Sequence, residues 1–360
     1  MKNVVTVIGG GNGGHAISAD LTLRGFDVCL YENAAFADRM QTVFDEKKIL
    51  LDGAAATGEA VLKQVTSDLS EAMEGAEVIF VAVPAFAHKA TAEAMAPYVE
   101  KGQTIVFLPG TFGSLLLWKI LKDQGKTDGV TVAETHTLPY ATRLMGPGKS
   151  LIMSCFKPLK IGVLPAARTA ETVEKLKIYY DCLEPVEHVI ACGLNSLNPI
   201  IHVPGCILNA GRIEYAKGEF YYYTEGFTRC VARTTDAIDQ ERIAMLKALG
   251  CDWDIAAHGI GSTVETDDVF EAVAHNPSFA RIKGPADFGN RYFQEDIPYG
   301  IASWVKMARA LEVPCDTMAA MVQMGSILLE KDCMAAGYTA DDWGISGRTR
   351  EELIRYLEEG

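Results

Sequence analysis

Several patterns that mark common protein classes are missing from this chain of 360 residues. Its nine cysteines are an odd number and contain no C-x-x-C pair, which argues against a disulfide framework and favours a reducing, cytoplasmic setting. No H-E-x-x-H or similar ligand spacing occurs, so we expect no metal. The longest apolar run, Val78–Val83, is too short to span a bilayer, and no membrane partner is expected.

A basic cluster is also missing. The net charge is −14 and the Lys and Arg residues are spread out, so a nucleic-acid partner is not expected. The first apolar strand pattern begins at Val4, which leaves no room for a signal peptide in the sequence as given. Hydrophobic content of 49% and charged content of 22% are typical of a globular protein, and the length suits two domains.

What is present is organised around a glycine-rich stretch near the start of the sequence. The apolar run Val4–Ile8 predicts a buried parallel strand, and it leads into Gly9-x-Gly11-x-x-Gly14. Helical periodicity follows until Gly25, and a second strand pattern at 27–31 is closed by Glu32. Strand, glycine loop, helix, strand and acid together form the dinucleotide-binding fingerprint in its required context.

The physical role of each position in this fingerprint follows from its chemistry. Gly9 permits the tight turn, Gly11 lets the backbone approach a pyrophosphate, and Gly14 lets helix and strand pack closely. Asn12 and Gly13 stand at the helix N-terminus, whose free N–H groups attract the phosphate charge. Glu32 can accept both ribose hydroxyls and would repel a 2′-phosphate, so we expect NAD, with NADH preferred over NADPH.

The first half of the chain alternates strand and helix patterns, which predicts a doubly wound parallel sheet of the α/β class. Expected strands cover 77–83, 103–108, 130–134, 151–156 and 161–164; expected helices cover 35–49, 68–73, 90–99, 115–124 and 170–180; residues 50–66 are a short β excursion. Val83 and Pro84 end one buried strand at the carboxyl edge of the sheet, where such folds bind ligands, and we assign both to the cofactor.

Beyond about residue 185 the strand patterns nearly vanish. Long helical periodicities replace them at 196–214, 229–248, 266–274, 300–311, 317–334 and 348–357. We therefore predict an NAD-binding Rossmann domain over residues 1–185 and an all-helical substrate domain over residues 186–360. A cleft between two such domains is the usual place for a second substrate.

Two segments of the helical half carry candidate chemistry. His202 is the titratable group of the apolar segment 195–205, and its ordinary pKa suits general acid–base work, although a buried core histidine gives the same pattern. In the segment 284–298, Arg291 can clamp a carboxylate, and Asp296 or Glu295 can orient a histidine; the alternative is a surface salt-bridge loop. The rival histidines of the first domain are His15, His88 and His136.

The motifs taken together resemble a known family. Gly9-x-Gly11-Asn12-Gly13-Gly14-His15-Ala16, Val83-Pro84-Ala85, Leu108-Pro109-Gly110-Thr111-x-Gly113, Asn198-x-x-x-His202-x-Pro204 and Asn290-Arg291-Tyr292-Phe293-x-Glu295-Asp296 follow one another as in the opine dehydrogenases of the octopine and nopaline type. The resemblance covers almost the whole chain and is strongest to the bacterial N-(1-carboxyethyl)-norvaline dehydrogenase branch. The sequence departs from the family at Thr111-Phe112, where small residues are common.

This resemblance implies an NAD(P)-dependent reduction of the imine formed between a 2-oxo acid, typically pyruvate, and the amino group of an amino acid. By motif, His202 is the acid–base residue and Asp296 its carboxylate partner, while Arg291 binds the oxo-acid carboxylate and Asn198 faces the same cleft. Tyr140 and Thr142 fall in the region that the family uses near the amino acid. The aromatic residues there, with those of 221–223, would suit an apolar amino acid.

Two other functions stay open at this point. A hydroxy-acid or sugar-phosphate dehydrogenase of the same two-domain architecture favours a catalytic lysine in the helical domain, where this chain offers His and Arg. A non-enzymatic nucleotide-binding regulator would be supported if His202 and Asp296 did not meet in space. The apolar helical segments are compatible with a homodimer and equally with a single chain with a well-filled core.

Overall fold

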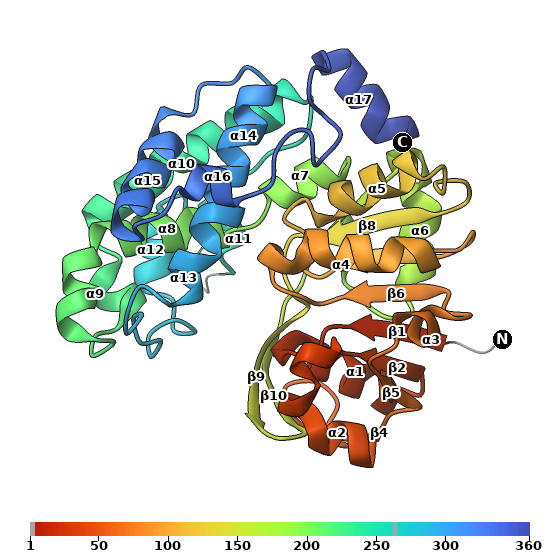
Figure 1. The fold of residues 1–360 in the computed structure, drawn as a ribbon. Helices are drawn as coiled ribbons and strands as arrows, with labels where there is room; N and C mark the ends of the chain where they lie inside the picture. Colours follow the sequence, from red (N-terminus) through yellow and green to blue (C-terminus); the bar gives the residue numbers. More distant parts are fainter. Residues whose placement is uncertain (1–3, 262–264) are drawn as a thin grey trace. The chain divides into compact units, whose positions relative to one another are not determined.

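The computed structural model describes residues 4–261 and 265–360, and the chain divides into two compact units. The first unit consists of Met1–Gly193 together with Arg355–Gly360, and the second unit is Leu194–Ile354. Along the chain, the second unit is therefore inserted ahead of the last residues of the first. Figure 1 shows the strands gathered in the first unit and a bundle of helices in the second.

The first unit is built on an eight-stranded sheet with the order β12-β11-β8-β7-β6-β1-β2-β5. Its strands are β1 (Val4–Ile8), β2 (Asp27–Tyr31), β5 (Gln64–Thr66), β6 (Val78–Val81), β7 (Thr104–Phe107), β8 (Thr131–Thr135), β11 (Leu159–Leu164) and β12 (Leu183–Pro185). All neighbours pair in parallel except β11, which is antiparallel to β8. The predicted α/β class with a doubly wound parallel sheet is confirmed, and the one antiparallel pairing of this sheet lies between β11 and β8.

The antiparallel edge has a topological cause. A parallel neighbour of β8 needs a long crossover connection, usually a helix. The chain instead forms a hairpin of β9 (Tyr140–Gly146) and β10 (Lys149–Cys155), and then returns to the sheet from the opposite direction.

That hairpin joins β3 (Lys48–Gly53) and β4 (Gly58–Val61) in a second, four-stranded sheet with the order β4-β3-β10-β9. Helix α1 (Asn12–Leu23) contacts β1 and β2 on one side and the strands of the smaller sheet on the other. All its residues from Gly13 to Leu21 are therefore buried. The expected strand at 151–156 lies in this smaller sheet, not in the main one.

The expected helix at 35–49 is also shorter than its periodicity suggested. The segment forms the 3-10 helix η1 (Ala34–Met40) and the short helix α2 (Gln41–Glu46), and Ile49 lies in β3. Lys47 ends α2 with a left-handed backbone (φ 54°). The β excursion expected at 50–66 is confirmed, and its last strand, β5, extends the main sheet.

The remaining helices of the first unit flank the main sheet. They are α3 (Leu69–Met73), η2 (Ala85–Ala87), α4 (His88–Met95), η3 (Ala96–Tyr98), α5 (Gly113–Asp123), η4 (Ala166–Arg168), α6 (Thr169–Leu176), α7 (Val189–Leu194) and the end of α17 (Arg350–Glu359). Residues such as Val5, Val7, Val78, Phe80 and Val106 form the core. Central strands buried on both faces explain why the sequence shows continuous apolar runs there.

The second unit is helical, and its described residues form no strand beyond one bridge between Tyr221 and Lys283. Its α-helices are α8 (Asn198–Leu208), α9 (Ala210–Ala216), α10 (Arg229–Ala248), α11 (Ala256–Gly259), α12 (Val269–Ala274), α13 (Arg291–Gln294), α14 (Ala302–Ala310), α15 (Asp316–Leu328) and α16 (Cys333–Ala336). Two π-helical turns, η5 (Tyr222–Gly226) and η6 (Asp296–Ile301), complete it. The expected helices at 196–214 and 317–334 are each broken in two.

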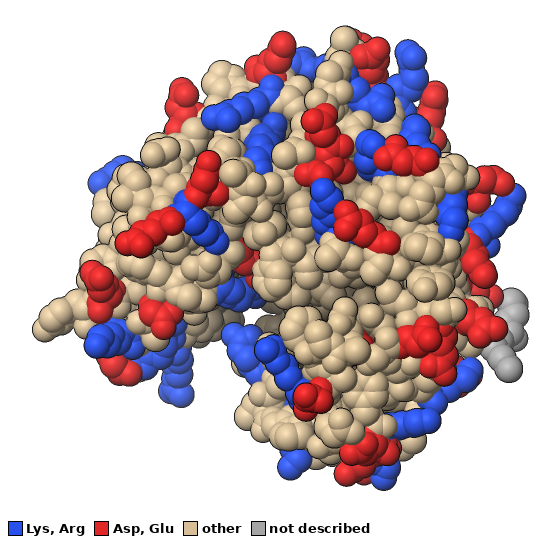
Figure 2. All heavy atoms as spheres, viewed as in Figure 1, with Lys and Arg blue, Asp and Glu red and all other residues tan. Residues whose placement is uncertain are grey.

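Two surface properties bear on partners. Figure 2 shows Lys and Arg side chains interspersed with Asp and Glu over the visible face. Among the described residues, one segment, Val189–Leu208, is apolar and long enough to cross a membrane, but 83% of its most apolar window is buried in the structure. A packed core helix has the same composition, and here the segment divides into α7 and α8.

Candidate active site

The glycine loop between β1 and α1 has the conformation that a dinucleotide needs. Gly9 has a φ of +107°, and a Cβ on Gly14 would lie 1.6 Å from the carbonyl oxygen of Gly9, so neither position accepts a side chain. A Cβ on Gly11 would meet nothing within 4 Å, which leaves open space over the helix N-terminus. Free N–H groups that face open space form an anion site, so a pyrophosphate fits this loop.

The neighbours of the loop are fixed by side-chain contacts. Oε2 of Glu32 accepts a hydrogen bond from the backbone N–H of Gly10 at 2.9 Å, which places the carboxylate at the base of the loop. Oδ1 of Asn12 accepts from the N–H of Leu144 in β9 at 2.7 Å. A Cβ on Gly9 would lie 2.8 Å from Cγ1 of Val83, so the end of β6 borders the turn, and Pro84 follows as the N-cap of η2.

The second unit brings His202 and Asp296 together. Nδ1 of His202, in α8, lies 2.7 Å from Oδ2 of Asp296, the first residue of η6, although the two are 94 residues apart in the sequence. Both residues are buried, with exposed fractions of 7% and 5%. A carboxylate can only accept, so Nδ1 carries a proton and donates it to Asp296. The pair therefore fixes the orientation of the imidazole ring.

Tyrosine side chains surround this pair, and sequence reasoning did not assign them to it. The hydroxyl of Tyr223 lies 3.0 Å from Nε2 of His202, and the ring of Tyr292 stacks on the imidazole at 3.6 Å between centroids and 14° between planes. The Tyr222 hydroxyl donates to the carbonyl oxygen of His202 at 2.8 Å. The signals in the sequence were the Tyr221–Tyr223 run and the position of Tyr292 inside the Asn290–Asp296 motif.

The other residues predicted for the second unit lie close to this cluster in the chain. Nε of Arg291 is 3.3 Å from Oε2 of Glu295, so the two acids left open by the sequence have different partners in the structure. The Arg291 side chain is 54% exposed, which leaves it accessible to a ligand carboxylate. Asn198 is the first residue of α8, half-buried and one turn before His202, a spacing that places both on one face of the helix.

Tyr140 and Thr142 lie in the first unit, on β9, and both are buried. The hydroxyl of Tyr140 donates to Oδ2 of Asp20 at 2.7 Å, and that of Thr142 donates to the carbonyl oxygen of Leu151 at 2.9 Å. These contacts give both side chains a structural role in joining β9 to α1 and β10.

The rival histidines have environments that keep them uncharged at neutral pH. Burial lowers the pKa of His15, and it lowers the pKa of His88, His136 and His188 to about 4. Nε2 of His88 contacts the carbonyl oxygen of Val83, and Nδ1 of His136 accepts from the N–H of Lys160. Each of these rings is accounted for by packing and backbone contacts.

A buried carboxylate that the sequence did not single out supports the loop after β7. Glu134, at the end of β8, is fully buried and accepts from the N–H of Phe112 (3.1 Å), the N–H of Ser114 (3.2 Å) and the Ser114 hydroxyl (2.5 Å). Thr111 and Phe112 have left-handed backbones, with φ of 44° and 66°. Burial raises the pKa of Glu134 to about 7. Glu134 therefore holds a strained loop at the carboxyl edge of the sheet.

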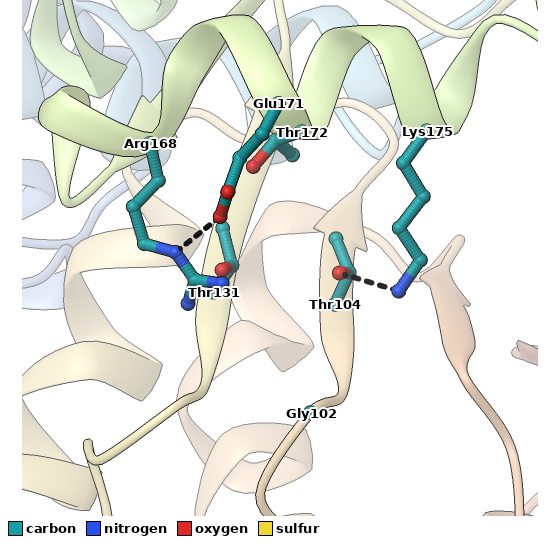
Figure 3. Close-up of a pocket in the computed structure, with 7 residues that line it drawn as sticks. All are labelled: Gly102, Thr104, Thr131, Arg168, Glu171, Thr172 and Lys175. Carbon is teal, nitrogen blue, oxygen red and sulfur yellow. Dashed lines mark hydrogen bonds and ion pairs between the residues drawn. The ribbon is translucent and has the colours of Figure 1, made fainter.

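A cavity of about 270 Å³ opens at the opposite edge, where Thr104 and Thr131 begin β7 and β8 (Figure 3). Arg168 and Lys175 of the adjoining helical segments point into it. Arg168 binds Glu171 and the carbonyl oxygen of Val130, and Lys175 contacts the hydroxyl of Thr104. Both cations are therefore used within the first unit. Across residues 4–261 and 265–360, no cluster of three or more His, Cys, Asp or Glu could hold a metal ion.

A glycine loop of this kind on a Rossmann-type sheet is the part of a nicotinamide enzyme that holds the cofactor, and the second unit adds a buried histidine–carboxylate pair. The fold and the site thus define an NAD(P)-dependent oxidoreductase with a helical second unit. The sequence predicted an enzyme of this kind, built from a Rossmann-type sheet followed by helices. Comparison with similar proteins confirms both predictions.

The chain belongs to the opine dehydrogenase family, as the sequence motifs predicted. It is 33% identical over 359 residues to "Opine dehydrogenase" of Arthrobacter sp. (strain 1C), with 98% of each chain covered. It is 27% identical over 363 residues to "Opine dehydrogenase" of Haliotis discus hannai, with 87% of each covered. Residues 185–329 match the family model "NAD/NADP octopine/nopaline dehydrogenase, alpha-helical domain", and residues 4–147 match "NAD-dependent glycerol-3-phosphate dehydrogenase N-terminus".

Solved structures share the fold over nearly the whole chain. An octopine dehydrogenase in complex with NADH and agmatine has a TM-score of 0.80 at 22% identity, covering 99% of this chain and 98% of that one. A yersinopine dehydrogenase with bound NADP⁺ has a TM-score of 0.75 at 14% identity, covering 100% and 99%. Relatives with either cofactor therefore share this architecture.

Proposed function

We propose that this enzyme reduces the imine formed between a 2-oxo acid, pyruvate in the first instance, and the amino group of an amino acid. The amine and the oxo acid condense with loss of water. Hydride addition to the imine carbon and protonation of nitrogen then give a secondary amine that carries two carboxylates. Each turnover consumes one reduced cofactor and one proton.

The observation that carries this proposal is the 2.7 Å contact between His202 and Asp296 in a chain that is 33% identical to an opine dehydrogenase. The alternative of a non-enzymatic nucleotide-binding regulator would be supported if these side chains did not meet, so the contact argues against it. A hydroxy-acid or sugar-phosphate dehydrogenase of this architecture would favour a lysine at this place, where the chain has His202.

Each residue of the second unit receives a role from its contacts. Nε2 of His202 donates a proton to the substrate carbonyl or imine, and the carboxylate of Asp296 holds the ring in place by accepting from Nδ1. Arg291 binds the oxo-acid carboxylate through its exposed guanidinium, because a guanidinium and a carboxylate can form two parallel hydrogen bonds. Asn198 lies on the same helix face as His202 and contacts the substrate there. Tyr140 and Thr142 remain predictions for the amino-acid side.

The cofactor is assigned to the first unit. Gly9, Gly11, Gly13 and Gly14 shape the loop, Asn12 and Gly13 begin helix α1, and Val83 with Pro84 border the turn. Glu32 accepts the ribose hydroxyls and disfavours a 2′-phosphate, so NADH is preferred over NADPH. When bound, the reduced nicotinamide supplies the hydride.

Three further parts of this proposal concern the division of the chain, the compartment and the oligomeric state. The first unit serves cofactor binding, and the second unit serves substrate binding and acid–base chemistry. The first unit ends at Gly193 rather than at the predicted residue 185 and also includes residues 355–360. All nine cysteines are free, which suits a reducing compartment such as the cytoplasm. A homodimer remains a prediction that size-exclusion chromatography with light scattering checks directly.

The decisive experiment measures NADH oxidation with pyruvate alone and then with pyruvate plus each common amino acid. The proposal requires that oxidation depends on both partners, and the best amine then identifies the amino-acid substrate. Oxidation with an oxo acid alone would assign the enzyme to the hydroxy-acid dehydrogenases instead.

A further inference from the structure

The hydroxyl groups of Tyr223 and Tyr292 continue the His202–Asp296 pair. The Tyr223 hydroxyl lies 3.0 Å from Nε2 of His202, and the Tyr292 hydroxyl lies 3.4 Å from that of Tyr223. Tyr223 is 5% exposed, whereas Tyr292 is only partly buried. The four side chains therefore form a continuous hydrogen-bonded row from a buried carboxylate to a hydroxyl nearer the surface.

The direction of these hydrogen bonds follows from valence. In the neutral ring, Nδ1 donates to the carboxylate of Asp296, so Nε2 has only a lone pair and must accept. The Tyr223 hydroxyl is then the donor to Nε2, and its oxygen accepts from the hydroxyl of Tyr292. The two tyrosine hydroxyl protons therefore point toward Nε2 of His202, and the proton on Nδ1 points toward Asp296.

Both key partners of the imidazole come from π-helical turns. Tyr223 lies in η5 and Asp296 begins η6, and such turns are rare and frequently mark functional sites. Neighbouring residues also pack against the tyrosines. The ring of Tyr223 stacks on Phe279 at 4.6 Å, and a Cβ on Gly205 would lie 2.3 Å from the hydroxyl of Tyr222, so only glycine admits that neighbour.

The charge states of the surrounding groups suit proton transfer. Burial raises the pKa of Tyr223 and of Tyr292, so both remain neutral hydroxyls that can donate and accept at once. Burial likewise raises the pKa of Cys206, which faces Tyr222 from α8. Asp296 and, farther out, Arg291 with Glu295 are the charged side chains of the adjoining turn.

We propose that Tyr223 and Tyr292 form a relay that returns a proton to Nε2 of His202 after each turnover. The inference rests on the proposed function, in which the imidazolium gives one proton per turnover to the substrate. Solvent protonates Tyr292 as Tyr292 passes its proton to Tyr223, and Tyr223 passes its own to Nε2. Each tyrosine loses one proton and gains one, so neither changes charge. Between turnovers the Tyr223 hydroxyl is hydrogen-bonded to Nε2 of His202. During a turnover the oxygen or nitrogen of the substrate takes the place of this hydroxyl at Nε2.

The relay is tested with Tyr223→Phe and Tyr292→Phe, which keep both rings and remove single hydroxyls. Tyr215→Phe is the matched control, because the Tyr215 side chain in α9 is 91% exposed and has no assigned role in the site. Enzyme pre-equilibrated near pH 6 with NADH is mixed with pyruvate and the best amine in a stopped-flow instrument. The first turnover and the following steady state are recorded separately, and thermal unfolding is measured for each variant.

A relay predicts that the first turnover of both variants stays within about twofold of wild type, since the relay acts only after His202 has given up its proton. Later turnovers slow by at least about tenfold, the lower range of what proton transfer contributes. Equal slowing of first and later turnovers, or no slowing in either variant, would overturn the relay. If Tyr223→Phe unfolds, Tyr292→Phe decides the question. Failure of the wild type to oxidise NADH with any pyruvate and amine pair would instead reject the proposed function.

Discussion

His202 differs from the other histidines in its partners more than in its burial. His15, His88 and His188 are buried as well and His136 is partly buried, but burial lowers the pKa of all four. The remaining two, His258 and His275, bind carboxylates at the exposed surface. His202, in contrast, is a buried ring that contacts a buried carboxylate, that of Asp296.

Replacement of His202 by Ala is expected to lower turnover by about 10²- to 10⁴-fold, the range that a general acid contributes. NADH affinity, measured by fluorescence titration, should be almost unchanged, because the glycine loop belongs to the first unit. His275→Ala removes an exposed ring that binds Glu271 and serves as the control. Unaltered turnover in the His202 variant would remove this residue from the mechanism.

Glu32 is expected to determine which dinucleotide is used. Glu32→Gln keeps an acceptor for the N–H of Gly10 but removes the charge, whereas Glu32→Ala removes both. The Ala variant should lose about 10- to 100-fold in NADH affinity, the value of a charge-assisted hydrogen bond, and both variants should discriminate less against NADPH. Steady-state kinetics with each cofactor measures the ratio. A wild-type preference for NADPH would contradict this role.

The sequence predicted those residues whose chemistry is encoded locally. The glycine spacing and the acid after the second strand identify the loop, and an isolated histidine in an apolar segment is visible as such. Tyr223 and Tyr292 could not be predicted, because they meet His202 from turns 21 and 90 residues away along the chain. The choice between Glu295 and Asp296 depends on where the π-helical turn begins, which no local pattern specifies.

At the scale of elements, the loop between β7 and α5 depends on one carboxyl group. Glu134, which is fully buried, accepts from two backbone N–H groups of this loop and from the Ser114 hydroxyl. A glutamine at this position would turn a donor toward the N–H of Ser114 and leave a buried group unpaired. Glu134→Gln is therefore expected to cost about 1–3 kcal/mol of folding free energy.

The pH dependence of stability provides a second signature of Glu134. Its pKa is raised from 4.5 to about 7 by burial, so between these values the folded protein keeps a proton that the unfolded chain releases. The contribution of Glu134 to stability therefore falls as pH rises from about 4.5 to 7. The free energy of unfolding, measured with urea at pH 5 and at pH 7.5, should fall less between these pH values for Glu134→Gln than for wild type. An equal fall in the free energy of unfolding for both proteins would show that the Glu134 carboxyl is already ionised in the folded protein below pH 5.

Element boundaries were predicted least well, and the backbone gives the reason. Lys47, Lys217 and Glu330 have left-handed conformations near the ends of α2, α9 and α15, positions where glycine usually signals the end of a helix. Because no glycine stands at these three positions, the apolar periodicity of the sequence does not show where each helix ends. The strand at 149–155 was detected, but nothing in its own residues tells which of the two sheets it joins.

At the scale of the whole molecule, the chain returns to the first unit after completing the second. Tyr356 and Leu357 are buried in α17, and Lys122 of α5 lies 4.9 Å above the ring of Tyr356 and donates to the carbonyl oxygen of Gly360. Gly360 packs so closely on Trp118 that a Cβ would lie 2.4 Å from the indole. Lys122 and Gly360, 238 positions apart in the sequence, thus meet in the first unit.

Leu357→Ala is expected to destabilise the protein by about 2–5 kcal/mol, the usual cost of removing a fully buried leucine side chain. Urea denaturation monitored by circular dichroism measures the change. The exposed neighbour Glu358 provides the control, since Glu358→Ala should alter the midpoint little. An unchanged midpoint for the leucine variant would show that the last turn contributes nothing to the first unit.

This return has a consequence for how the protein is made on the ribosome. Domains generally fold in the order of their synthesis, from the N-terminus onward. Here Leu194–Ile354 is continuous and can fold as soon as it has emerged, whereas the unit begun first lacks residues 355–360 until all of the second has been translated. The nascent Rossmann-type sheet must wait with the surface around Trp118 uncovered, so the half that binds the nucleotide is the last to be completed.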